Sequence, residues 1–182
     1  MKEWTKKESR EVSRGKIYSY LQETYQSNET STQGVFDILK FNDWVNIFAL
    51  NSDGEVILVK QFRAGNQKLT LEIPGGAIDF GESDPLLAAQ RELQEETGYT
   101  SKKWTLLGKV DPNPAFMRNN CYSFLAEDCV KSADQNLDHL EEIEVESVAL
   151  SEFNQMVETG EIAHSLVLST YLLYRMKKEK SI

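Results

Sequence analysis

The distribution of apolar and polar residues along the chain predicts short strands with helices between them. Runs rich in β-branched and aromatic side chains, bounded by turn residues, are typical of strands. Such runs occupy residues 35–50 (one or two strands), 55–62, 68–73, 104–110, 121–126 and 143–150. Asn51 to Gly54 (NSDG) provide turn residues between the first two runs, which predicts a hairpin.

Three segments have the pattern of helices. In the first, Asp84 is an N-cap residue, Pro85 stands at the first helical position and Gly98 follows the last turn, which predicts a helix over Pro85–Thr97. The second segment, residues 151–158, begins at Ser151 as its cap. The third, residues 164–178, has an apolar face and ends in lysines. Strands outnumber helices, and the two types of element are interspersed.

The N-terminal part of the chain is more polar. Residues 26–33 (QSNETSTQ) are expected to form an exposed loop, and residues 16–20 and 35–41 are candidate strands on either side of it. A chain of 182 residues can bury a core without metal or disulfide support, and one compact domain is the default expectation.

The charge balance limits the kind of ligand. Asp and Glu number 29 against 20 Lys and Arg, a formal charge of -9, which is the wrong sign for a protein that coats a nucleic-acid backbone. If the ligand is a phosphate compound, a divalent cation has to bridge the like charges. Cys121 and Cys129 lack metal-site spacing and are expected to be buried thiols outside any disulfide. Because the charged N-terminus and the lack of a long apolar run favour neither export nor membrane insertion, a cytoplasmic protein is expected.

Three acidic residues share one face of the first predicted helix. Glu92, Glu95 and Glu96 lie about a third of a turn from the apolar face that carries Leu93. Like charges at these spacings each cost a few tenths of a kcal/mol, roughly, so helix stability does not explain them. A solvated face is the ordinary interpretation of such a cluster in an acidic protein. A magnesium site is the alternative, because Mg²⁺ prefers several anionic oxygens close together.

The residues around this cluster favour the metal site. They resemble the Nudix box, G-x5-E-x7-R-E-U-x-E-E-x-G-U, where U is a bulky apolar residue. The matching positions are Gly76, Glu82, Arg91, Glu92, Leu93, Glu95, Glu96, Gly98 and Tyr99. One difference is an extra residue, since eight positions, 83–90, separate Glu82 from Arg91 where the family has seven. We expect the loop before Pro85 to absorb it, which leaves the role of Glu82 open.

The resemblance implies a fold and a set of site residues. The fold is the Nudix α/β/α sandwich, an α/β architecture with a mixed central sheet, here preceded by N-terminal strands. The implied metal ligands are the Gly75 carbonyl, Glu92, Glu95 and Glu96 with Mg²⁺, for which Mn²⁺ can substitute. Arg91 would hold the carboxylates in place, and Glu95 can act in either role. Residues 141–145 resemble the segment that carries a catalytic glutamate in the family's sugar-nucleotide branch, which points to Glu141 first and Glu142 second.

Residues 61–76 resemble the same branch, whose members act on ADP-ribose and other nucleoside diphosphate sugars; there Arg63, Glu72 and Gly76 would contact the substrate. The expected reaction is hydrolysis of the pyrophosphate bond to a nucleoside monophosphate and a sugar phosphate. Alternatives are another nucleotide substrate (NADH, a dinucleoside polyphosphate or a triphosphate) and a sensor that binds without cleaving.

The expected organisation is residues 1–42 as strands that form a homodimer and 43–182 as the Nudix domain. The expected partner is a nucleotide-sugar small molecule, with no nucleic acid and no membrane. His139 and His164 are expected to be a loop and a helix-face histidine rather than ligands.

Overall fold

The computed structural model describes residues 3–179, which form two units. The first unit contains the described residues up to Asp43 together with Asp111–Asn120. The second contains Trp44–Val110 and the described residues from Cys121 onward. Residues 111–120 therefore interrupt the second unit in the sequence but belong to the first unit.

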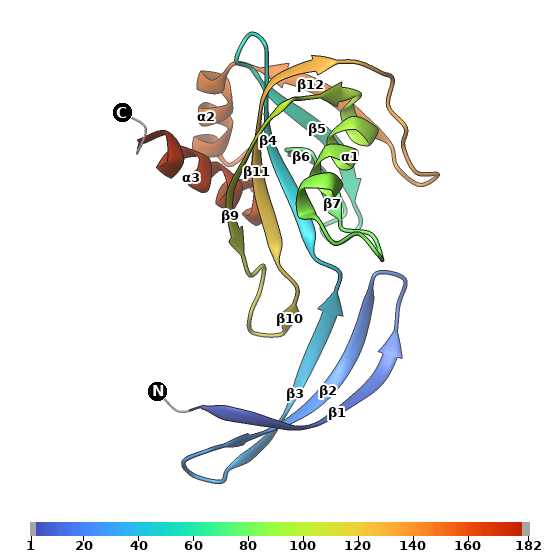
Figure 1. Cartoon of the computed structure of the whole chain (residues 1–182), viewed down its shortest axis with the longest axis vertical. Coiled ribbons are helices and arrows are strands. Elements are labelled where there is room, and N and C mark those ends of the chain that lie inside the picture. The colour runs from blue at the N-terminus through green and yellow to red at the C-terminus, as the bar shows by residue number, and fades with distance from the viewer. Residues whose placement is uncertain (1–2, 180–182) are drawn as a thin grey trace. The chain divides into compact units, whose positions relative to one another are not determined.

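The first unit is a four-stranded sheet. Its strands are β1 (Trp4–Arg14), β2 (Tyr18–Ser27), β3 (Gln33–Phe41) and β10 (Met117–Arg118), in the order β1-β2-β3-β10 (Figure 1). β1, β2 and β3 are antiparallel, and β10 is parallel to β3. The strand expected at residues 16–20 is present but extends to Ser27, and residues 28–32 form the expected exposed turn. β1 was not expected from the sequence, because its residues are mostly polar and all exposed.

A buried carboxylate joins residues 111–120 to this sheet. The Glu23 side chain on β2 is fully buried and accepts hydrogen bonds from both terminal nitrogens of Arg118, at 2.9 and 2.5 Å. Tyr25 Oη and Ser9 Oγ donate to the same carboxylate at 2.8 and 3.0 Å. The Arg118 guanidinium, ahead of these hydroxyls, lowers the pKa of Glu23 to about 2. The folded first unit thus favours the ionised form of Glu23.

The second unit contains a mixed sheet. Its strands are β4 (Trp44–Asn51), β5 (Val56–Arg63), β6 (Lys68–Glu72), β7 (Gly75–Ala77), β8 (Tyr99–Thr100), β9 (Lys103–Val110), β11 (Cys121–Lys131) and β12 (Ile143–Val148). The central order is β12-β5-β4-β11-β8, with β6 paired to β5, β7 to β4 and β9 to β11. β4 and β11 are parallel, and the other pairs are antiparallel. The hairpin expected at Asn51 to Gly54 joins β4 to β5.

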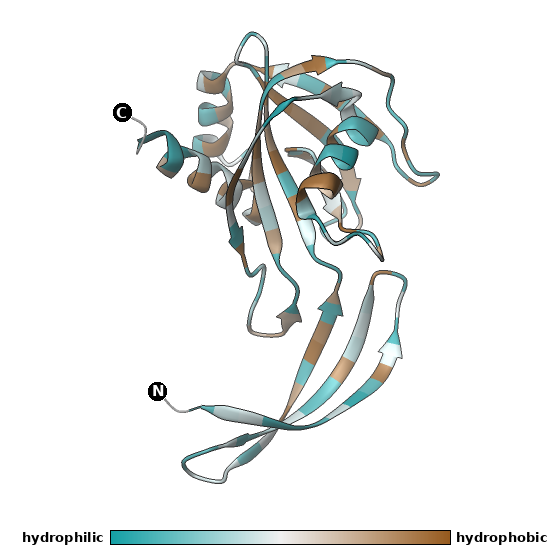
Figure 2. Ribbon diagram, viewed as in Figure 1, coloured by the Kyte–Doolittle hydropathy of each residue, from teal (hydrophilic) through white to brown (hydrophobic). Residues whose placement is uncertain are grey.

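Helices cover both faces of this sheet (Figure 1). Helix α1 (Pro85–Thr97) lies on one face, and α2 (Leu150–Thr159) and α3 (Ser165–Glu179) lie on the other. Each face has its own apolar core: Ala88, Ala89 and Leu93 of α1 pack in one, and Phe153, Val167 and Tyr174 of α2 and α3 pack in the other. Both colours of the hydropathy scale appear along α2 and α3 in Figure 2, as expected of helices with one buried face. The expected α/β/α sandwich with a mixed sheet is confirmed.

The helix boundaries agree with the sequence at α1 and differ at α2. Asp84 Oδ1 accepts from the Leu86 amide at 2.9 Å, and Gly98 ends α1 with a φ of 73°. At α2 the expected cap at Ser151 is wrong, because the helix begins at Leu150 after Ala149, with no side-chain cap. Cys121 and Cys129 are buried and form no disulfide. None of the helices within residues 3–179 has the length and apolar character needed to span a membrane.

Candidate active site

One face of helix α1 is apolar and buried, and the exposure of each of its three carboxylates depends on how close it lies to that face. Leu93 is fully buried in the core below the helix. Glu96, one turn later on the same side, is only 4% exposed. The Glu92 side chain is 14% exposed and that of Glu95 is 36% exposed. The cluster is therefore not a solvated helix face: two of its three carboxylates point into the protein.

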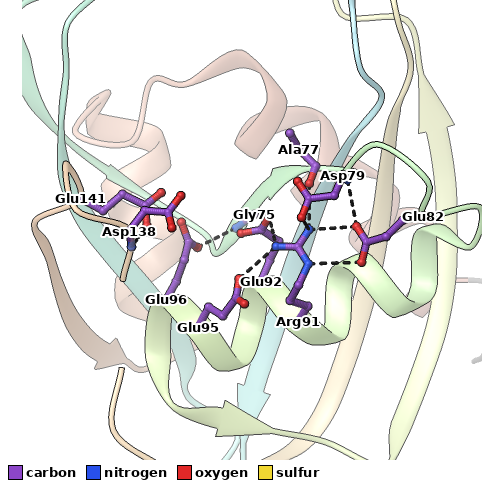
Figure 3. Close-up of polar contacts among 10 residues, drawn as sticks. All are labelled: Gly75, Ala77, Asp79, Glu82, Arg91, Glu92, Glu95, Glu96, Asp138 and Glu141. Carbon is purple, nitrogen blue, oxygen red and sulfur yellow. Dashed lines mark hydrogen bonds and ion pairs between the residues drawn. The ribbon is translucent and has the colours of Figure 1, made fainter. Parts of the chain in front are cut away.

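Arg91 is the main cation among these carboxylates (Figure 3). Its Nη1 donates to Glu92 at 2.8 Å and to Glu95 at 3.0 Å. Its Nε and Nη2 donate to Glu82 at 3.2 and 3.1 Å, and Nη2 also donates to the Ala77 carbonyl at 3.0 Å. Glu82, whose role was left open by the extra residue in the box, thus holds the opposite side of the guanidinium. The expected orienting role of Arg91 has a direct geometric basis.

The Pro74-Gly75-Gly76 segment approaches α1 closely because it has no side chains. Glu96 accepts a hydrogen bond from the Gly75 amide at 2.9 Å. A Cβ added at Gly76 would lie 2.5 Å from the Glu92 carboxylate, and one at Gly75 would lie 2.3 Å from the Val45 carbonyl oxygen. Glycine is therefore required at Gly75, where the contact is with backbone, while a side chain at Gly76 would displace the Glu92 carboxylate; β7 thus brings its backbone against the carboxylates of α1.

Burial raises the proton affinity of the two inner carboxylates. It raises the pKa of Glu92 to about 7 and that of Glu96 to about 8, and the charge of Glu141 adds to both shifts. Arg91 opposes the shift at Glu92, and the Gly75 amide opposes it at Glu96. Burial thus favours the protonated forms of Glu92 and Glu96, and a bound cation would shift both carboxyls back to their ionised forms.

This donor set fits a hard divalent cation in its chemistry. Carboxylate and carbonyl oxygens are the ligands that Mg²⁺ and Mn²⁺ prefer, and a bound cation would favour the ionised forms of Glu92 and Glu96. Within residues 3–179 no three carboxylate, imidazole or thiol groups converge closely enough to enclose a metal ion in this arrangement. Arg91 instead occupies oxygens of Glu92 and Glu95. These bonds use one oxygen of each carboxylate, Oε1 of Glu92 and Oε2 of Glu95, so Arg91 leaves the second oxygen of each side chain for a cation.

Glu141 lies on the loop between β11 and β12. Its amide donates to the Asp138 carbonyl at 2.9 Å, and its carboxylate accepts from the Asp138 amide at 3.0 Å, which closes a tight turn. Figure 3 shows Asp138 and Glu141 on the side of Glu96. The charge of Glu141 acts on both Glu92 and Glu96, so the turn lies near the α1 carboxylates. Glu142, the second choice, is also exposed.

Arg63 and Glu72, the expected substrate contacts, bind each other. Arg63 donates from Nε and Nη2 to the two oxygens of Glu72 at 2.9 and 2.7 Å, and Thr70 Oγ1 donates to Glu72 at 2.6 Å. Glu72 is only 2% exposed, whereas 43% of the Arg63 side chain is exposed. The charges of Glu96 and Glu141 help raise the pKa of Arg63, so this pair lies close to the metal-binding candidates.

His164 lies near Glu72, which the sequence did not predict. Its charge lowers the pKa of Glu72, although burial acts most strongly on that carboxylate and in the opposite direction. The imidazole Nδ1 is buried and has no hydrogen-bond partner among the described residues. The residue was expected to lie on the face of a helix, but α3 begins at Ser165, directly after it.

A polar hollow of about 340 Å³ adjoins the outer side of α1. It is lined by Arg91, Gln94, Glu95, Ala133, Asp134 and Asn136. Arg91 and Glu95 thus face both the carboxylate cluster and an open surface.

Comparison with known proteins agrees with this geometry. Residues 40–169 match the NUDIX domain. The ADP-ribose pyrophosphatase of Bacillus subtilis (strain 168) is 38% identical over 127 residues, which cover 69% of this chain and 68% of that protein. The ADP-ribose pyrophosphatase of Saccharomyces cerevisiae is 33% identical over 154 residues, covering 81% of this chain and 63% of the yeast protein.

A solved structure described as an ADP compounds hydrolase has the same fold, with a TM-score of 0.85 and 21% sequence identity, over 98% of this chain and 95% of the other. This likeness shows the fold alone. The domain match covers most of the chain, and with the relative from Bacillus subtilis it shows that the chain belongs to the Nudix family.

Proposed function

We propose that this protein is a magnesium-dependent pyrophosphohydrolase that cleaves nucleoside diphosphate sugars, ADP-ribose or GDP-mannose among them, to a nucleoside monophosphate and a sugar phosphate. The observation that carries the proposal is the burial of Glu92 and Glu96 against Gly75 and Gly76, which gathers carboxylate oxygens that a divalent cation would ionise and bind. The names of the relatives supply the substrate class, since the Bacillus subtilis and yeast proteins are ADP-ribose pyrophosphatases.

The residues of this chain divide the work between binding and chemistry. Glu92, Glu95, Glu96 and the Gly75 carbonyl would hold Mg²⁺, or Mn²⁺ in its place, and the bound cation would neutralise the diphosphate and acidify a water molecule. Glu141 lies on the loop that faces these carboxylates and would orient or deprotonate the attacking water. Glu142 is the alternative at this step.

Other residues prepare the substrate. Arg63 has an exposed guanidinium edge and would bind a phosphate oxygen, while buried Glu72 fixes the direction of that guanidinium. Gly76 allows close approach to the α1 carboxylates. Arg91 keeps Glu92 and Glu95 in place through its bonds to Glu82 and to both carboxylates. Since a guanidinium is always charged, it supports this arrangement at every working pH.

A substrate panel tests the proposed function. Purified protein is incubated with ADP-ribose, GDP-mannose, UDP-glucose, NADH, a diadenosine polyphosphate and the nucleoside triphosphates, each with Mg²⁺ and with EDTA. Chromatography then detects any nucleoside monophosphate formed. We expect this product only from the sugar nucleotides and only with metal. Cleavage confined to triphosphates, or binding of ADP-ribose without cleavage by the metal-loaded protein, would reject the proposal.

We also propose that the protein is a homodimer formed through its N-terminal strands. The first unit leaves apolar side chains exposed, namely Trp4, Val12, Val35 and Phe36 on its sheet and Ile17 in the turn between β1 and β2. Apolar side chains gathered on one sheet are typical of surfaces that pair with another chain. Light scattering at micromolar concentration should give twice the chain mass of 20.8 kDa; a monomeric mass would contradict the dimer.

The two buried thiols, outside any disulfide, agree with a reducing compartment such as the cytoplasm.

A further inference from the structure

The C-terminal end of α1 is capped by a segment distant in sequence. The last carbonyls of a helix have no partners within the helix and need donors from elsewhere. Here the Asn136 amide donates to the Glu95 carbonyl at 2.9 Å, and the Ser132 amide donates to the Gly98 carbonyl at 2.9 Å. Residues 132–136, which follow β11, thus hold the turn of α1 that carries the carboxylates.

The Gln135 side chain connects this segment to two other elements. Its side-chain Nε2 donates to the Glu96 carbonyl at 2.6 Å and to the Ile143 carbonyl at 3.1 Å. An amide nitrogen carries two hydrogens, so both bonds can form at once. One bond ends on the metal-binding turn of α1, and the other ends at the first residue of β12. A single side chain therefore joins the two elements between which Glu141 must be placed.

The loop that carries Glu141 has few other constraints. It leaves the capping segment after Asn136 and enters β12 at Ile143, where pairing with Gln61 of β5 begins. Between these points Glu141 bonds with Asp138 inside its own turn. Leu140, at the tip of the turn, is 85% exposed, so packing contributes little to its position. The distance between Glu141 and the α1 carboxylates therefore depends on how firmly the two ends of the loop are held.

We propose that Gln135 is a positioning residue for the hydrolytic reaction: its amide sets the distance between the Glu141 turn and the carboxylate-bearing end of α1. The proposal rests on the proposed function for its catalytic consequence, though not for its structural one. Within residues 3–179 the Gln135 side chain hydrogen-bonds to two backbone carbonyls, and it acts through Glu141. Displacement of a reacting group by about 1 Å can cost a hundredfold in rate, so loss of this bridge should lower kcat more than it raises KM.

The test replaces Gln135 by methionine, which keeps the length of the side chain and removes both donors. We expect kcat for the best sugar nucleotide to fall about 10- to 100-fold, with KM changed by less than about twofold. In a Glu141→Gln background the same replacement should have little further effect, because both changes act on one step. Equal losses of kcat in the two backgrounds, or a wild-type kcat for Gln135→Met, would overturn the proposal.

A second measurement does not depend on activity. Hydrogen–deuterium exchange of the metal-free protein should show faster exchange across residues 137–142 in Gln135→Met, while the amides of β4 and β5 keep their protection. Unchanged exchange in the loop would overturn the positioning role even if kcat falls. If the wild-type protein cleaves no substrate in the panel, the proposed function fails while exchange alone decides the role of Gln135.

Two further variants keep the result interpretable. Gln155→Met changes an exposed glutamine on α2 in the same way and should leave kcat and exchange at wild-type values. Gln135→Asn retains the amide but is one methylene shorter, so it can hold one carbonyl at most, and intermediate values are expected. This variant replaces Gln135→Met if the latter does not fold. An unfolded Gln135→Asn protein would assign Gln135 to general stability and overturn the proposal.

Discussion

Replacement of Glu96 by glutamine is expected to lower the rate of sugar-nucleotide cleavage by about a thousandfold or more, because a bound cation supplies several kcal/mol of charge stabilisation and each 1.36 kcal/mol is tenfold in rate. Glutamine keeps the size of the side chain and an oxygen for the Gly75 amide, but it loses the charge that holds the metal. Steady-state kinetics with saturating Mg²⁺ measure the loss. A variant with a near-wild-type rate would remove Glu96 from the proposed metal ligands.

The same variant should be at least as stable as the wild-type protein when metal is absent. Burial raises the pKa of Glu96 to about 8, above its ordinary value of 4.5, so its contribution to stability is complete below the unfolded-state pKa. That contribution is lost as the pH rises from about 4.5 to about 8. In EDTA, the melting temperature of Glu96→Gln minus that of the wild type should therefore increase across this range. A difference that shrinks with rising pH would contradict the raised pKa.

Glu141→Gln is expected to lower kcat by about 10²- to 10⁴-fold, which is the usual contribution of a general base. The loop turn that carries Glu141 lies near Glu92 and Glu96, and glutamine cannot accept the proton of the attacking water. KM should change much less than kcat, since the substrate contacts proposed at Arg63 and Glu72 are untouched. Initial-rate kinetics on the best substrate of the panel provide the measurement.

Glu142→Gln is the matched control for this prediction. It removes the same charge from the neighbouring exposed residue and so reproduces any general electrostatic effect of the loop. We expect its kcat to stay within about threefold of the wild type, well below the loss expected for a general base. The opposite pattern, with a large loss at Glu142 and none at Glu141, would transfer the catalytic role to Glu142.

The sequence predicted α1 and its carboxylates well because the signals are local. Asp84, Pro85 and Gly98 are cap residues whose effect depends on near neighbours, and the helix has the expected bounds. The box motif also lies within a short stretch of chain. The burial of Glu96 could not be predicted, since it depends on Gly75 of β7 and on the approach of residues 132–136.

Other features depend on contacts between distant residues. β1 has no apolar alternation, and it forms a strand because it pairs with β2 over nearly its whole length. At α2, burial of Phe153 and the backbone bonds to the Ala149 carbonyl set the start of the helix, which overrides the preference of Ser151 for the cap. Gln135 carried no signal in a single sequence, and Glu82 matched the box without an assigned role, because the fold determines the partners of both side chains.

Residues 111–120 belong to the first unit, although the second unit flanks them on both sides in the sequence. This arrangement limits how the chain can be divided. A shortened protein beginning at residue 43 would keep Arg118 but lack Glu23. The Arg118 guanidinium would then lose the buried carboxylate that accepts hydrogen bonds from both of its terminal nitrogens. Such a truncation would also remove β3, against which Met117 and Arg118 form their short parallel pairing. We therefore expect a fusion or domain transplant that carries only residues 43–182 to lose stability around residues 111–120, because this segment pairs with the first unit.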